Sequence, residues 1–130
     1  MVAAPEPDAL REAAYFVDRL STEEMPLAGL VLNRTHPVLA DLSANQARAA
    51  ADGLRGAPLA AAVLRLHADR VDLAGREDRL LARFTKAHGA VSVTRVPVVA
   101  SVGDLDGLRE IGHHLAAATN APVGRSSTAS

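Results

Sequence analysis

The sequence contains no cysteine and no tryptophan, and its aromatic residues are only Tyr15, Phe16 and Phe84. The absence of cysteine excludes a disulfide framework, a thiolate zinc site and a cysteine nucleophile. With so few aromatic rings, the chain lacks a platform on which nucleic-acid bases stack. The formal net charge of −1 argues against nonspecific binding to nucleic acid or to an acidic membrane surface. We therefore expect no nucleic-acid partner.

Long hydrophobic runs are also missing. No window approaches the roughly 18 apolar residues of a membrane span. Residues 1–8 have neither the basic start nor the apolar core of a secretion signal. We expect a cytoplasmic protein without direct membrane insertion. The length of 130 residues is typical of one domain.

The clearest strand pattern is the nearly continuous apolar run over residues 27–33, which follows Pro26. A run without polar alternation is typical of a strand buried on both faces, in the middle of a parallel sheet. An amphipathic helix is predicted over residues 8–24, with Asp8 as its N-cap. A short apolar stretch over residues 2–4 precedes that helix. Strand, helix and strand in this order predict a βαβ unit with parallel strands.

Two further helices are predicted after this unit. Ser43 and Gln46 have the spacing of a capping box, which starts a helix over about 43–54. Apolar residues recur in near-heptad steps over 59–88, although Arg70 and Glu77 interrupt the stripe. A helix of that length spans about 45 Å. We therefore expect either a kink near Gly75 or a helix that projects from the domain.

The chain closes with a predicted strand over 91–97 and a helix that begins at Asp104 or Asp106. The order β-α-β-α-α-β-α predicts an α/β fold with a partial parallel sheet of about three strands and flanking helices. We expect residues 1–118 to form one α/β domain, with a helical insertion at about 43–88. Residues 119–130 lose all periodicity and are predicted to be a flexible tail.

Three loops are predicted to meet at one edge of this sheet, because parallel strands end on the same side. They contain Pro5-Glu6, Asn33-Arg34 and Pro97-Val98. The amide of Asn33 offers a hydrogen-bond donor and an acceptor together, as does the edge of a purine base. Val98 and Val99 are candidates for an apolar wall over the base.

The ordered motifs resemble the carboxyl-terminal half of the anion-transporting ATPases. That family includes the arsenite-pump ATPase and the ATPase that delivers tail-anchored membrane proteins. Its members are MinD-related P-loop proteins that act as nucleotide-dependent dimers. The resemblance covers roughly residues 2–115. It is carried by the segments Ala4-Pro5-Glu6, Gly29-Leu30-Val31-Leu32-Asn33-Arg34, Arg95-Val96-Pro97 and Leu105-Asp106-Gly107-Leu108-Arg109-Glu110-Ile111-Gly112.

The resemblance implies the carboxyl portion of a P-loop NTPase-like fold that binds ATP or ADP. It implies that Asn33 contacts the adenine and that Pro97, Val98 and Val99 line the base pocket. Arg34 would reach a phosphate or a partner, with a surface salt bridge as the other interpretation. The partner would be a second copy or a paralogous subunit.

The chain departs from the family in the residues that hold phosphate. Its Gly53-Leu54-Arg55-Gly56 segment lacks the Lys-Ser/Thr of a P-loop, and the switch carboxylates are missing. Magnesium would then be held by the half that is missing here. We predict that the chain does not hydrolyse ATP alone. The Cys-x-x-Cys clasp of the family's eukaryotic targeting members is also absent, which argues against tail-anchor delivery.

Other candidates have simpler interpretations. His113 and His114 are adjacent on a predicted helix and point about 100° apart, so we expect no metal site there. His36 follows the Asn33 strand, either as a ligand contact or as a turn residue. The alternative function is a non-catalytic interaction or dimerisation module that uses the long helix over 59–88.

Overall fold

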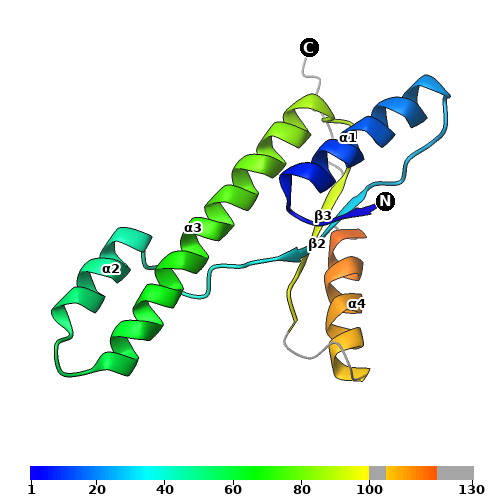
Figure 1. Ribbon diagram of the computed structural model, residues 1–130. Helices are drawn as coiled ribbons and strands as arrows, with labels where there is room; N and C mark the ends of the chain where they lie inside the picture. The colour runs from blue at the N-terminus through cyan, green and yellow to red at the C-terminus, as the bar shows by residue number, and fades with distance from the viewer. Residues whose placement is uncertain (100–104, 120–130) are drawn as a thin grey trace, which may run out of the picture. The chain divides into compact units, whose positions relative to one another are not determined.

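The computed structural model describes residues 1–99 and 105–119. Its elements follow the predicted order (Figure 1). They are β1 (Val2–Ala3), α1 (Pro7–Thr22), β2 (Leu30–Thr35), α2 (Ala44–Gly53), α3 (Pro58–Ala87), β3 (Val93–Pro97) and α4 (Leu105–Thr119). The predicted α/β class and the partial parallel sheet are thus confirmed.

Contacts within the chain divide it into two compact units, Met1–Val98 and Val99–Ser130. The first unit contains the sheet with α1, α2 and α3. The second contains α4. No helix in the described part of either unit has the length and apolar character needed to cross a membrane.

The sheet has the order β1-β2-β3, with all strands parallel and β2 in the centre. The predicted middle position of this strand is confirmed, but its burial on both faces is not. Leu30 and Leu32 on one face are each 1% exposed, whereas Val31 and Asn33 on the other face are half-buried. The pairing of β2 with β3 starts at Leu30, three residues later than the predicted start of the strand at residue 27. The preceding Gly29 approaches β3 so closely that an added Cβ would lie 2.8 Å from the Ser92 carbonyl oxygen. Only glycine fits this approach.

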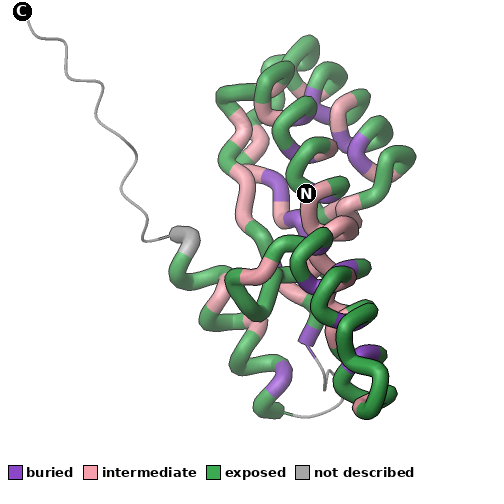
Figure 2. Tube along the Cα trace, turned by 90° about the vertical axis from the view of Figure 1, so that its left-hand side faces the viewer, coloured by how far each residue is buried: buried purple, intermediate pink, exposed green. Residues whose placement is uncertain are grey.

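One face of the sheet carries the main core. Leu30 and Leu32 pack there against apolar side chains of α1 and α3. The buried members of this core are Leu10, Ala13, Val17, Leu30, Leu32, Leu81 and Phe84. Buried residues recur at helical spacing along α1, α2 and α3, with exposed residues between them (Figure 2). The amphipathic pattern of the sequence thus fixes which sides of α1 and α3 meet the sheet.

The predicted bounds of α1 are wrong by one residue at the start and by two at the end. The N-cap is Glu6, not Asp8, because Pro7 occupies the first helical position, where no backbone N–H is required. Asp8 lies in the first turn and pairs with Arg11 at 2.8 Å. The helix ends before Glu24, whose φ of 55° is left-handed and cannot continue it.

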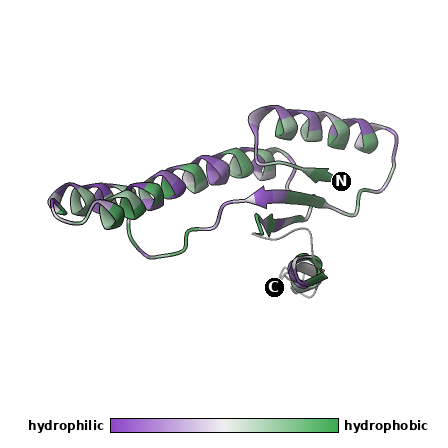
Figure 3. Cartoon of the chain, turned by 60° about the horizontal axis from the view of Figure 1, so that its bottom comes forward, coloured by the Kyte–Doolittle hydropathy of each residue, from purple (hydrophilic) through white to green (hydrophobic). Residues whose placement is uncertain are grey.

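The helices α2 and α3 form an antiparallel hairpin. The predicted capping box at Ser43 and Gln46 is present. The 30-residue α3 runs without interruption through Gly75, and its N-terminal half extends with α2 beyond the sheet (Figure 3). Of the two predicted outcomes for this helix, the projecting one is correct. The hairpin buries small residues, with Ala47 and Ala68 each 0% exposed.

In the second unit, α4 starts at Leu105, so Asp106 lies inside the helix and is not its cap. Asp106 pairs with Arg109 at 2.7 Å. Leu108 and Leu115 of this helix are 57% and 38% exposed. Asp104 and the tail over 120–130 lie outside the described residues.

Candidate functional site

The carboxyl ends of β1 and β2 border a small hollow of about 130 Å³. It brings together the segment after β1, the end of β2 and the middle of α3. The lining residues are Ala4, Pro5, Glu6, Arg34, His36, Leu73 and Glu77. The predicted meeting of Pro5-Glu6 with Arg34 is therefore observed, with α3 as the third wall. All of these residues belong to the first unit.

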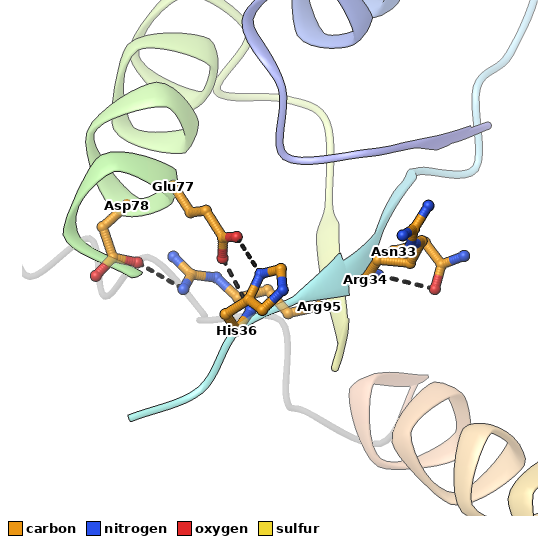
Figure 4. Close-up of polar contacts among 6 residues, drawn as sticks. All are labelled: Asn33, Arg34, His36, Glu77, Asp78 and Arg95. Atoms are coloured by element: carbon orange, nitrogen blue, oxygen red, sulfur yellow. Dashed lines mark hydrogen bonds and ion pairs between the residues drawn. The ribbon is translucent and has the colours of Figure 1, made fainter. Parts of the chain in front are cut away.

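A pair of polar side chains, buried Glu77 and half-buried His36, closes the hollow toward α3. His36 Nδ1 lies 2.6 Å from Oε1 of Glu77, and the His36 backbone N–H donates to Oε2 at 2.9 Å (Figure 4). Glu77 is 4% exposed. A buried carboxylate is tolerated only when both oxygens find partners, and here one residue supplies them. The pair fixes the end of β2 to α3.

Arg34 occupies an unusual backbone position beside this pair. Its φ is 63°, and the β2–β3 register is irregular between Asn33 and Thr35. Asn33 pairs with Val96 and Thr35 pairs with Pro97, so two steps on β2 oppose one on β3. This is a bulge, which redirects a side chain at a strand end. The left-handed conformation of a non-glycine residue costs about 1–3 kcal/mol. Residues in such strained conformations are often found at functional sites.

Asn33 stabilises the bulge through its side chain. Its Oδ1 accepts a hydrogen bond from the Arg34 backbone N–H at 2.9 Å. Asn33 alternates with Leu32, so it belongs to the face of β2 opposite the main core. Its amide points away from the His36–Glu77 pair (Figure 4). Asn33 therefore does not line the hollow that contains Arg34.

The remaining predicted site residues follow β3. Pro97 is the last residue of that strand and is in register with Thr35. Val98 is 47% exposed, and its backbone N–H donates to the Thr35 carbonyl at 2.9 Å. Asn33, Pro97 and Val98 thus lie at neighbouring positions across β2 and β3. Val99 is 9% exposed and is the first residue of the second unit.

Ion pairs surround the site on α3. Arg95 of β3 pairs with Asp78 at 2.6 Å. Farther along α3, Arg48 of α2 contacts Asp72 at 2.6 Å and Asp69 at 3.3 Å. The hydrogen bond from Arg48 is the main cause that lowers the pKa of Asp72. The same bond raises the pKa of Arg48. These ion pairs connect α3 to α2 and β3.

Metal ligands are sparse in this region. Across residues 1–99 and 105–119, no group of three histidine, cysteine, aspartate or glutamate side chains is arranged to hold a metal ion. His36 and Glu77 are the nearest approach to such a group, and they satisfy each other. The prediction that magnesium is held outside this chain stays a prediction.

Comparison with known proteins gives no assignment: no protein-family model matches the chain, and no curated protein matches it.

The His36–Glu77 pair was not predicted from the sequence. Two separate signals were visible: a carboxylate within the apolar stripe of a long helix, and a histidine directly after a buried strand. Each has many simple explanations alone. A buried glutamate requires a hydrogen-bond partner, so these two signals together indicate a contact between Glu77 and His36.

Proposed function

We propose that this chain forms the adenine side of a nucleotide site in an anion-transporting-type P-loop ATPase. The observation that carries the proposal is the adjacency of Asn33, Pro97 and Val98 at the carboxyl ends of two neighbouring parallel strands. Ligands of open α/β sheets bind at such edges. The observed β-α-β-α-α-β-α order, which the sequence pattern predicted, is compatible with this proposal.

The chemistry of this edge suits a base better than a whole nucleotide. Asn33 Oδ1 uses one of its two lone pairs for Arg34, which leaves an acceptor and the amide N–H groups for an adenine edge. The half-exposed side chain of Val98 offers apolar surface at the same edge, where the Val98 backbone N–H donates to the carbonyl of Thr35. In contrast, the hollow at Arg34 is about 130 Å³, below the roughly 300–1,000 Å³ of typical ligand sites.

The phosphates and magnesium would be held by residues outside these 130. A nucleotide held only by its base binds weakly, because the strong charge-assisted contacts to phosphate are missing. The isolated chain is therefore expected to bind ATP and ADP alike and to hydrolyse neither. In the active assembly, the partner is a second copy or a paralogous subunit in the cytoplasm.

The proposal is tested by titrating the isotope-labelled chain with ADP and recording its NMR spectrum. We expect shifts of the Asn33 side-chain amide and of the Arg34 and Val98 backbone signals. Asn33→Ala should abolish these shifts, whereas Asn45→Ala, an exposed asparagine on α2, should leave them intact. If ADP moves no signal at this edge, or if Asn33→Ala changes nothing, the proposal is wrong.

A second candidate function is an interaction module built on the hairpin. It is favoured by the exposed apolar side chains of α3, where Leu59, Val63 and Leu66 are 79%, 58% and 68% exposed. Leu59 and Val63 form part of an apolar surface at the start of α3, together with Ala57, Pro58, Ala60 and Leu64. The same ADP titration separates the two candidates. The module predicts no response at Asn33, and it predicts self-association that Leu59→Glu abolishes.

A further inference from the structure

Three arginines on α3 lie beside the start of α1. Arg76, Arg79 and Arg83 line a hollow of about 200 Å³ together with Pro7 and Leu80. Their spacing of three and four residues places them on one side of the helix. This hollow shares no lining residue with the hollow at Arg34.

The side chains of these arginines are not engaged in direct pairs. Within residues 1–99 and 105–119, none of the three makes a hydrogen bond or an ion pair. The carboxylates near them on α3 are engaged elsewhere. Asp72 is held by Arg48, Glu77 by His36, and Asp78 by Arg95. Asp72 also attracts Arg76 and Arg79 electrostatically, although its hydrogen bond goes to Arg48. The three guanidinium groups therefore border one small hollow without a direct ion pair in the described part of the chain.

The start of α1 adds to the positive potential. This 16-residue helix has Pro7 at its first position, and its N-cap, Glu6, makes no side-chain capping bond. The backbone bond from Leu10 N–H to the Glu6 carbonyl is the first of the helix, so the N–H groups of Asp8 and Ala9 precede the hydrogen-bonded turns. The one acidic side chain of the first turn, Asp8, pairs with Arg11. The positive end of the helix dipole thus faces a region that already carries arginines.

We propose that this hollow binds a phosphate-bearing anion of one or two phosphoryl groups. Guanidinium groups present forked donors that match phosphate oxygens, and helix N-termini favour the same negative charge. A volume of about 200 Å³ is smaller than a typical organic-ligand site of roughly 300 Å³ or more, so it accepts the phosphates and not an attached base. The inference does not depend on the nucleotide proposal, because an inorganic anion carries no adenine.

The test is a titration of the full chain with inorganic pyrophosphate, followed by NMR of the arginine Nε–H groups and of the backbone. Signals of Arg76, Arg79, Arg83 and Asp8 should move together. Because each guanidinium contributes charge-assisted bonds, Arg79→Gln should weaken binding about tenfold. The triple Gln variant should not bind measurably. Raising the salt concentration should also weaken binding.

Arg65→Gln is the matched control, because Arg65 is an exposed arginine of the same helix outside the hollow. It should bind pyrophosphate as the unmodified chain does. An equal loss in this control, or shifts only at Asn33 and Val98, would overturn the inference. So would equal competition by a short glutamate peptide, since that would indicate general acidic attraction. A circular dichroism spectrum of each variant separates lost binding from lost folding.

Two sources of the phosphate group are distinguished by comparing pyrophosphate with ADP. If pyrophosphate binds more tightly than ADP, the ligand of the hollow is a free inorganic anion. If the two bind equally and shift the same arginine signals, the ligand is the phosphate end of a larger molecule. If neither compound shifts the arginine signals, the phosphate site is rejected. The nucleotide proposal is tested separately, by the signals of Asn33.

Discussion

The two halves of α3 pack in opposite ways. The C-terminal half buries large side chains, with Leu81 and Phe84 in the core against the sheet. The N-terminal half buries alanine, with Ala68 at 0% exposure, and leaves Leu59 and Leu66 in solvent. One continuous helix thus joins a region with an ordinary core to a hairpin with almost none.

This difference has an energetic consequence. Burial of apolar surface stabilises by about 25 cal/mol per Å², so alanines that meet alanines add little. The hairpin therefore depends on close backbone approach and on ion pairs such as Arg48–Asp72 and Arg65–Asp52. We expect it to open locally at lower free energy than the sheet unit. Its exposed leucines form the kind of apolar surface that a partner covers.

The largest expected effect is that of Phe84→Ala. Phe84 is 5% exposed within the main core, so its removal should destabilise the chain by about 3–5 kcal/mol. Urea unfolding followed by circular dichroism measures this. Leu66→Ala, on the other half of the same helix, should change the free energy of unfolding by less than about 0.5 kcal/mol. Similar losses in the two variants would show that the halves do not differ as described.

The junction between the two halves is probed by Glu77→Ala. Removal of this carboxylate leaves the His36 ring nitrogen and backbone N–H without their partner and should cost about 2–3 kcal/mol. His36→Ala removes only the ring, so the double variant should show a coupling energy of about 0.5–3 kcal/mol. The free energies come from urea unfolding of all four proteins. Strict additivity would mean that the pair does not connect α3 to β2 energetically.

Much of the fold could be predicted from local patterns. The apolar run before Asn33 indicated a central strand, and the Ser43–Gln46 spacing indicated a capping box; both are observed. These features depend on short-range chemistry that a sequence displays directly. The start of α1 was misplaced because Asp8 has the better capping side chain, while Pro7 fixes the first helical position through its backbone.

The site was less predictable, because it depends on details of pairing. The sequence indicated that Asn33 and Arg34 lie at one edge, but not that a bulge sends their side chains to different surroundings. The ion pairs of α3 were not visible in the sequence either, because Arg48 of α2 and Arg95 of β3 reach its carboxylates from other elements. Contacts between distant segments carry no local signature.

The smallest expected effect concerns the ion pairs of the hairpin. The pKa of Asp72 is lowered in the folded chain, first by the hydrogen bond from Arg48. A carboxyl group with a lowered pKa stabilises the fold above its unfolded pKa, which is about 3.9 for aspartate, and this contribution disappears as the pH falls through the folded pKa. The α2 amides should therefore lose hydrogen-exchange protection below about pH 4 more steeply than the sheet amides do.

Two variants test this expectation. Asp72→Asn should remove the extra pH dependence of the α2 amides. Asp41→Asn should retain it, because Asp41 is an exposed aspartate without an ion pair in the described part of the chain. If the Asp72 variant keeps the same pH profile, the Arg48–Asp72 pair does not stabilise the hairpin, and the contrast with the sheet unit depends on buried area and not on this pair.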